Sequence, residues 1–163
     1  MIILLLSTVN LYESPLRTKE KPLSGFSKNS WKFFDELVKI NEEIFQELGL
    51  AYRLVNISGG ELGAPNAKKI DCEVWIPSQN CYRELTSCSH DTDFQARRLK
   101  IKYKEKEKID YVHTLNDTAL AIGRAIVAIL ENYQQKDGTV LIPKVLQKEC
   151  GFSKINFPLE RKK

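Results

Sequence analysis

The 163-residue chain has only four cysteines and two histidines, the residues from which zinc and redox centres are usually built. Its four cysteines show no CxxC spacing, and no paired histidines lie near them. Zinc binding and thioredoxin-like chemistry are therefore not expected, and reduced, packed thiols in a cytosolic protein are the default. Lysine and arginine alternate with acidic residues in most places, so the net charge of +4 comes without a polybasic nucleic-acid arm.

Long hydrophobic runs are also lacking. A bilayer span needs about 20 consecutive apolar residues, and no stretch of the sequence reaches this length. The opening MIILLL is too short for a signal peptide and has no basic region before it, and no transit-peptide pattern follows. We expect a cytoplasmic location, with an organelle as the alternative, and no membrane partner. With 42% hydrophobic and 28% charged residues, the composition indicates one globular domain.

One apolar stretch carries a single charge. From Ala119 to Leu130 every residue is apolar or glycine except Arg124, which predicts a helix buried on all sides. A guanidinium keeps its proton and is costly to bury unpaired, so Arg124 should meet an anion. That anion is either a protein carboxylate, in a buried structural salt bridge, or a ligand phosphate. Three polar residues just ahead of the run are candidate N-caps, namely Asn116, Asp117 and Thr118.

The first half of the chain predicts a helix followed by strands. Asn29-Ser30 should cap a helix from about Trp31 to Leu48, which Gly49 ends. Its broad apolar stripe, expected to cover a sheet, comprises Trp31, Phe34, Leu37, Val38, Ile40, Ile44, Phe45 and Leu48. Strands are expected at 51–57, 70–76, 81–89 and 111–116, with a lysine-rich strand ahead of a solvated turn at 104–108.

Residues 70–76 alternate strictly, which gives this strand two different faces. Ile70, Cys72, Val74 and Ile76 should face a core, while Asp71, Glu73 and Trp75 form the floor of the opposite side. The turn at 77–80 favours an antiparallel hairpin to the next strand. Because no helix separates successive strands, we predict an α+β fold with a largely antiparallel sheet flanked by helices.

Three separated blocks carry a family resemblance. SGGELGAPNAKKIDCEVWIP, YRELTSCSHDTDFQARRLKIKY and HTLNDTALAIGRAIVAILENYQQKDGTVLIPKVL together resemble the C-terminal half of the catalytic domain of seryl-tRNA synthetase. The last block is similar to motif 3 of the class II aminoacyl-tRNA synthetases, and DFQARR is close to diagnostic. On this basis residues 1–28 are an unmatched segment or linker, residues 29–158 a partial catalytic domain, and residues 159–163 a basic tail.

The resemblance implies an ATP-dependent ligase that makes seryl-adenylate and then moves serine to tRNA(Ser). Arg124 falls on the motif 3 arginine that lies along the ATP triphosphate, which makes it a catalytic candidate together with Glu84. Glu84 and Ser87 fall on the residues that hold Mg²⁺ at the phosphates, and Asn116 and Thr118 on the pair that contacts serine. The family's complete enzymes are expected to be homodimers.

Each of these assignments has a structural alternative. Strict alternation puts Glu84 and Ser87 on opposite faces, so a bulge or strand end between them is needed for a shared ion. Glu84 could instead be a cross-strand partner of a basic residue, and Asn116 and Thr118 no more than a helix cap. The DFQARR cluster is expected to be a structural salt-bridge and capping knot, and Lys68 and Lys69 to be solvent-facing loop residues.

The departures from the family pattern matter as much. Where the family has SNCTD, this chain has Ser89 to Asp93 reading SHDTD, so His90 and Asp91 are unusual. We expect His90 to be a surface substitution rather than a base. The 163 residues contain no counterpart of motifs 1 and 2 or of the tRNA-binding helical arm. The alternative function is therefore a truncated, inactive paralogue that acts as a nucleotide-binding or regulatory module.

Overall fold

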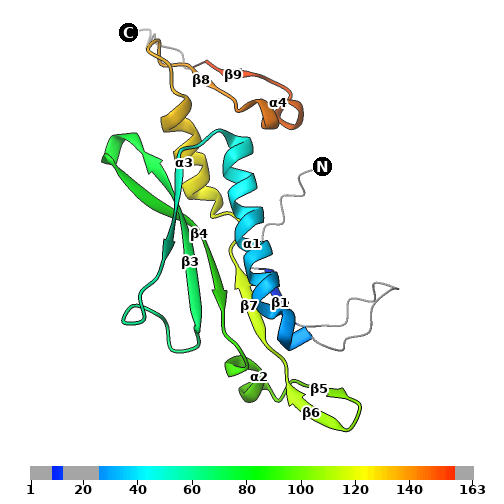
Figure 1. The fold of residues 1–163 in the computed structure, drawn as a ribbon. Coiled ribbons are helices and arrows are strands. Elements are labelled where there is room, and N and C mark those ends of the chain that lie inside the picture. Colours follow the sequence, from blue (N-terminus) through cyan, green and yellow to red (C-terminus); the bar gives the residue numbers. More distant parts are fainter. Residues whose placement is uncertain (1–8, 13–25, 157–163) are drawn as a thin grey trace.

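The centre of the fold is a five-stranded sheet with the strand order β1-β7-β4-β3-β2. The computed structural model describes residues 9–12 and 26–156. In Figure 1 the long helix α1 lies along this sheet, α3 packs near its upper end, and α2 with the β5–β6 hairpin lies at the opposite end. The elements are β1 (Val9–Tyr12), α1 (Phe26–Leu48), β2 (Tyr52–Asn56), β3 (Lys68–Ile76), the 3-10 turn η1 (Pro77–Gln79), β4 (Cys81–His90), α2 (Phe94–Leu99), β5 (Lys102–Glu105), β6 (Lys108–Tyr111), β7 (Thr114–Asp117), α3 (Ile122–Tyr133), β8 (Val140–Leu141), α4 (Lys144–Cys150) and β9 (Lys154–Ile155).

The predicted α+β class is confirmed, because every pairing within the main sheet is antiparallel. The 77–80 turn joins β3 and β4 as a hairpin, as expected. β1, which lies within the segment 1–28 that the resemblance left unmatched, pairs with β7 at one edge of the sheet. The expected basic tail 159–163 lies outside the described residues.

Several boundaries differ from the sequence-based expectation. The single strand expected at 111–116 is divided between the end of β6 and β7. Lys68 and Lys69 are half-buried residues of β3 rather than loop residues, since the ladder with β4 extends to His90. Helix α1 begins at Phe26, so Asn29-Ser30 lies inside the helix and does not cap it.

The apolar stripe of α1 is narrower than predicted. Phe34, Val38 and Phe45 are buried, whereas the side chains of Trp31 and Ile40 are 43% and 49% exposed. Residues three and four apart share a helix face, and only one such row meets the sheet. The helix contributes that row to the core and leaves its flanks in solvent.

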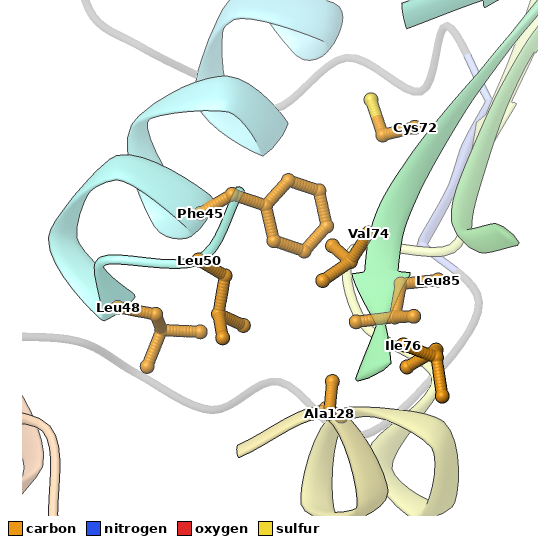
Figure 2. Packing of buried hydrophobic residues seen from close by; sticks show 9 residues of the cluster. Phe45, Leu48, Leu50, Cys72, Val74, Ile76, Leu85 and Ala128 are labelled. Carbon is orange, nitrogen blue, oxygen red and sulfur yellow. The ribbon is translucent and has the colours of Figure 1, made fainter. Parts of the chain in front are cut away.

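The main core lies where the end of α1 meets β3, β4 and α3 (Figure 2). It contains the apolar face of β3 that the alternation predicted, except that Ile70 belongs to a second cluster around Phe34. The members of the main cluster are Phe45, Leu48, Leu50, Cys72, Val74, Ile76, Leu85, Ala125 and Ala128. The strand face opposite this core is the one left available for a site.

The prediction that the helix of 119–130 is buried on all sides is wrong. α3 begins only at Ile122, and its buried residues are Ala125 and Ala128. Ile126 and Val127 are 52% and 43% exposed. The small alanines let one face of α3 approach β3 closely, and no element among the described residues covers the other face.

The predicted N-caps of this helix are wrong as well. β7 continues through Asp117, and the N-cap position is Ala121, which makes no side-chain capping bond. The polar residues Asn116, Asp117 and Thr118 therefore belong to a strand and its exit, so capping does not explain them.

All four cysteines are free thiols. Cys72 and Cys88 are buried, and burial raises the pKa of the Cys72 thiol to about 12 and raises the pKa of Cys88 as well. Such thiols stay protonated and unreactive at neutral pH. Among residues 9–12 and 26–156, no helix has the length and apolar character to span a membrane.

Candidate functional site

A bulge in β4 shapes the face of the sheet opposite α1. Cys72 of β3 pairs with Thr86, but its neighbour Glu73 pairs with Glu84, so Leu85 is an extra residue in β4. Residues directly opposite each other in an antiparallel ladder share a face. Glu84 therefore lies on the face of Glu73, and Ser87, which pairs with Asp71, lies on the same face. The bulge expected between Glu84 and Ser87 is confirmed.

The chain from 116 to 124 runs antiparallel along the bulged strand. Asn116 is the cross-strand partner of Ser89. The Thr118 N–H donates to the Ser87 carbonyl at 3.1 Å, and the Ala121 N–H donates to the carbonyl of the bulged Leu85 at 3.0 Å. In the first turn of α3, Nη1 of Arg124 donates to the Glu84 carbonyl.

These contacts bring the sequence-predicted site residues into one strip along β4. Its two ends hold Asn116 beside Ser89 and Arg124 beside Glu84. Thr118 joins the strip through its main chain at Ser87 and is half-buried. The ends are on the order of 15 Å apart, given a rise of about 3.4 Å per strand residue. We call this set of residues (Glu84, Ser87, Asn116, Thr118 and Arg124) the site strip.

The Arg124 end of the site strip opens into a pocket of about 490 Å³. Arg124 and Glu84 both contribute to its wall. The expected burial of Arg124 is wrong, since the side chain is 54% exposed at the uncovered face of α3. Its nearest carboxylate contact, to Glu84 Oε1, is a single one at 3.9 Å rather than a bidentate pair. The lining residues are Glu73, Ile76, Gln79, Tyr82, Arg83, Glu84, Leu85, Arg124 and Val127.

Of the three residues that the strand alternation had assigned to a floor, Glu73 lines the pocket. Glu73 accepts a hydrogen bond from Arg53 Nε at 2.6 Å. The Arg53 guanidinium lies 4.7 Å from the centre of the Tyr82 ring, which in turn meets the Trp75 ring edge to face at 5.2 Å. Sequence reasoning missed Arg53, although its place in the expected strand 51–57 could have indicated it once the register of β2 and β3 is known.

At the other end of the site strip, Asn116 belongs to a network of side-chain amides around a buried carboxylate. Asn116 Nδ2 donates to Asp91 Oδ2 at 3.1 Å, and Asn66 Nδ2 donates to Asp91 Oδ1 at 2.6 Å. Asp91 is 0% exposed, and this burial raises its pKa, although the two amide hydrogen bonds act in the opposite direction.

Asp117, the neighbour of Asn116, faces the other way. Its carboxylate lies under α1, where Oδ1 accepts hydrogen bonds from Asn41 Nδ2 at 2.9 Å and Thr86 Oγ1 at 3.2 Å. Burial raises the pKa of Asp117. Because successive side chains of a strand point to opposite faces, Asp117 of β7 points to the core side of the sheet and Asn116 to the site face.

His90 is not the surface substitution that was expected. It is 0% exposed, and its ring stacks on Trp31 with 3.9 Å between centroids. Its position in β4 pairs it with Leu115 on the α1 side of the sheet, so it does not belong to the site face. No sequence signal separated a buried from an exposed histidine at this position.

The DFQARR segment forms α2, and its salt bridge is confirmed by Asp93 and Arg97, whose Oδ2 and Nη2 are 2.6 Å apart. Asp93 occupies the N-cap position without a side-chain capping bond, so the capping part of the expectation is wrong. Within the described part of the chain no three His, Cys, Asp or Glu side chains gather into a metal cluster.

The chain shares its sequence family and its fold with known proteins. A family model described as the tRNA synthetase class II core domain (G, H, P, S and T) matches residues 18–133. The chain belongs to this class II tRNA synthetase family. Within the family, its relatives include serine–tRNA ligases. It is 53% identical over 137 residues to the enzyme of Pyrococcus horikoshii and 56% identical over 122 residues to that of Sulfolobus acidocaldarius.

Two solved structures give the same result for the fold. The seryl-tRNA synthetase of Pyrococcus horikoshii complexed with ATP matches with a TM-score of 0.78 and 53% identity over 82% of this chain. The cytoplasmic serine–tRNA ligase of Naegleria fowleri in complex with AMP matches with a TM-score of 0.75 and 43% identity over 80% of this chain. The two matches cover 30% and 32% of those chains. The chain likewise spans 30% and 27% of the Pyrococcus and Sulfolobus relatives, while the matches cover 83% and 74% of this chain.

Proposed function

We propose that this chain carries the motif 3 half of a seryl-tRNA synthetase active site. In the complete site, the serine carboxylate displaces pyrophosphate from ATP to form seryl-adenylate, and serine then passes to tRNA(Ser). The observation that carries the proposal is the pairing of residues 116–124 with the bulged β4, which aligns every residue of the site strip along one strand. Relatives complexed with ATP and AMP support the nucleotide part of the proposal.

In this proposal Arg124 binds the triphosphate. Its guanidinium is half-exposed at a pocket and has only one long carboxylate contact, so its donors are available to an anion. A planar guanidinium matches two phosphate oxygens at once, and such a contact stabilises charge that develops during phosphoryl chemistry. Glu84 then has two roles, since its carbonyl holds Arg124 while its carboxylate stays on the site face.

Glu84 and Ser87 fit a magnesium ion that is bound together with ATP. Mg²⁺ uses few protein carboxylates and keeps water and phosphate oxygens as its other ligands, so one carboxylate and one hydroxyl on the same face are sufficient. When bound, the ion neutralises charge on the phosphate oxygens.

Asn116 and Thr118 are proposed to contact the serine substrate. A site that selects serine over alanine must offer polar groups that would be left unpaired without the substrate hydroxyl. The amide of Asn116, which alternation directs to the site face, is such a group. Thr118 supplies a second polar side chain two residues further along the site strip.

The test is a titration of the 163-residue protein with ATP and Mg²⁺, followed by two-dimensional NMR, which detects weak binding. We expect shifts at Glu84, Ser87 and Arg124, and at least a roughly tenfold weaker affinity in Arg124→Ala, because charge-assisted hydrogen bonds contribute about 1.5–3 kcal/mol. Arg98→Ala is the matched control, since Arg98 lies on α2 outside the pocket lining. Equal affinity in both variants would overturn the assignment of Arg124.

A further inference from the structure

The carboxylate of Asp91 links two segments that lie far apart in the sequence. Asn66 follows the glycine-rich loop after β2, and Asn116 lies in β7. Each donates its side-chain N–H to a different oxygen of Asp91, at 2.6 Å and 3.1 Å. Within the described part of the chain, no lysine or arginine pairs with Asp91, so the two amides are the side chains that hold this buried carboxylate.

Asp91 is itself fixed by its main chain. Its N–H donates to the Thr114 carbonyl at 3.0 Å, and its carbonyl accepts from the Phe94 N–H at 3.1 Å. These bonds fix its backbone at the end of β4, beside the start of β7. The carboxylate therefore has little freedom to follow a change in the orientation of either amide.

Charge decides which way the Asn116 amide points. An ionised carboxylate only accepts hydrogen bonds, so the Asn116 NH₂ group must face Asp91 and its carbonyl oxygen Oδ1 must face away from it. With Asp91, Asn116 presents an acceptor to the site face.

Asn66 is held in a similar way on the loop side. Its N–H donates to the Gly63 carbonyl at 2.9 Å, and a Cβ added at Gly63 would lie 2.9 Å from Asn66 Oδ1. Asn66 thus packs against the backbone of the loop, while its NH₂ group holds the second oxygen of Asp91. Because Asn66 occupies Oδ1, the other carboxylate oxygen of Asp91, Oδ2, accepts the hydrogen bond from Asn116.

We propose that Asp91 is a positioning residue that fixes Asn116 as a hydrogen-bond acceptor for a donor group of the substrate, the hydroxyl of serine. The inference rests on the proposed function and adds to it that Asn116 accepts, rather than donates, the hydrogen bond with the substrate. Asp91 stands where the family pattern SNCTD has cysteine, whose thiol is a weak acceptor, so the anchor is a feature of this chain.

The experiment compares Asp91→Asn with Asp93→Asn in ¹⁵N-labelled protein, with serine and ATP·Mg²⁺ as separate titrants. Asparagine keeps the shape of Asp91 but puts an NH₂ group against one of the two neighbouring amides. We expect the Asn116 side-chain resonances to shift and the serine affinity to fall at least about tenfold, since hydrogen bonds to charged groups contribute about 1.5–3 kcal/mol. The affinity for ATP·Mg²⁺ should stay within about twofold. Asp91 acts on the Asn116 end of the site strip, whereas the residues proposed to bind ATP lie toward the other end.

Asp93→Asn is the matched control because Asp93 pairs with the exposed Arg97 on α2, and we expect it to leave both titrations unchanged. Asp91→Cys, which restores the family residue, provides a second variant if Asp91→Asn does not fold, and it should show the same loss. Unchanged Asn116 resonances and unchanged serine affinity in a folded Asp91 variant would overturn the proposal. If the unsubstituted protein shows no response to serine, the proposed function fails, and the Asn116 resonances alone then decide whether Asp91 orients this amide.

Discussion

Both histidines of the chain lie next to Ser30 of α1, and they form a hydrogen-bonded series. The Ser30 hydroxyl is 3.0 Å from His90 Nε2 and 2.8 Å from His113 Nδ1. His90 Nδ1 accepts the Thr92 N–H at 3.1 Å. This bond requires an unprotonated Nδ1, so His90 is neutral in the folded protein.

At the residue scale we predict that His90 makes the free energy of unfolding fall as the pH becomes acidic. Burial, followed by the charge of His113, lowers its pKa from 6.5 to about 4. An unfolded histidine takes up a proton below its ordinary pKa of about 6.5, whereas the folded one does so only near pH 4. The contribution of neutral His90 to the free energy of unfolding is therefore fully present above pH 6.5 and is lost as the pH falls to 4. The loss is about 1.4 kcal/mol per pH unit and about 3 kcal/mol in all.

The measurement is urea unfolding between pH 7.5 and pH 4 of the unsubstituted protein and of His90→Asn. In this pH range, the free energy of unfolding of His90→Asn should change less with pH than that of the unsubstituted protein. His113→Gln is the control and should keep most of the slope, although burial lowers the pKa of His113 too. Asp91 and Asp117 act in the opposite direction, because their raised pKa values favour the folded state as the pH falls. Parallel curves for the protein and His90→Asn would contradict the prediction.

Sequence reasoning named the candidate site residues but did not predict their surroundings. The family motif supplied Glu84, Ser87, Asn116, Thr118 and Arg124, and the register now aligns them along β4. Burial was harder to predict, because it depends on contacts between distant segments. Arg124 sits in an apolar run yet is half-exposed, and His90 sits in a polar run yet is fully buried.

At the scale of elements, the end of α1 is fixed by a capping arrangement around Gly49. The Leu50 N–H donates to the Phe45 carbonyl at 3.1 Å and the Gly49 N–H to the Gln46 carbonyl at 3.0 Å, which is the Schellman pattern. Gly49 has a φ of +66°, and the Tyr133 hydroxyl of α3 donates to the Leu48 carbonyl at 2.5 Å beside it. The cap therefore also joins α1 to α3.

We predict that Gly49→Ala destabilises the protein by about 2–4 kcal/mol. A Cβ would lie 2.6 Å from the Tyr133 hydroxyl. The left-handed backbone adds about 1–2 kcal/mol for a residue with a Cβ, and overpacking typically about 1–3 kcal/mol. Gly151→Ala is the matched control, because Gly151 has a φ of +76° but nothing within 4 Å of its added Cβ, so only the backbone cost remains. Equal losses in urea unfolding would show that the contact with Tyr133 does not matter.

Element types followed from the sequence more readily than their ends did. Alternation in 70–76 and the turn at 77–80 identified the central hairpin, and Gly49 identified the end of α1. The start of α3 was misplaced because β7 and the bulged β4 hold residues 114–121 in an extended path by main-chain hydrogen bonds. A residue's own preference for capping does not reveal such a partner strand.

At the scale of the whole molecule, the uncovered face of α3 should make this polypeptide associate with itself. Ile126 and Val127 expose apolar side chains next to the pocket, and exposed apolar surface favours association. We expect sedimentation velocity to show assemblies that increase with protein concentration, and Ile126→Lys to reduce them. Ile109→Lys is the control, because Ile109 is 62% exposed but lies on the distant β5–β6 hairpin. An equal effect of both substitutions would contradict a role for α3.

The last prediction concerns catalysis by a polypeptide of these 163 residues. In the proposed function the site strip contacts the phosphates, the ion and one side of serine, while the chain spans about 30% of the length of its Pyrococcus horikoshii relative. The family resemblance assigns the contacts to the α-phosphate and to the serine ammonium to motifs that these residues do not contain. Loss of one preorganised charged donor typically lowers the rate by about 10²–10³, and several would be lost here.

We therefore expect weak ATP·Mg²⁺ binding but neither serine-dependent pyrophosphate exchange nor charging of tRNA by the purified polypeptide. A complete relative, such as the serine–tRNA ligase of Pyrococcus horikoshii, is the positive control under the same conditions. Exchange at a rate near that of the control would show that residues 1–28 or a second copy of the chain supply the missing contacts. The site strip would then be part of a site that this polypeptide completes by itself.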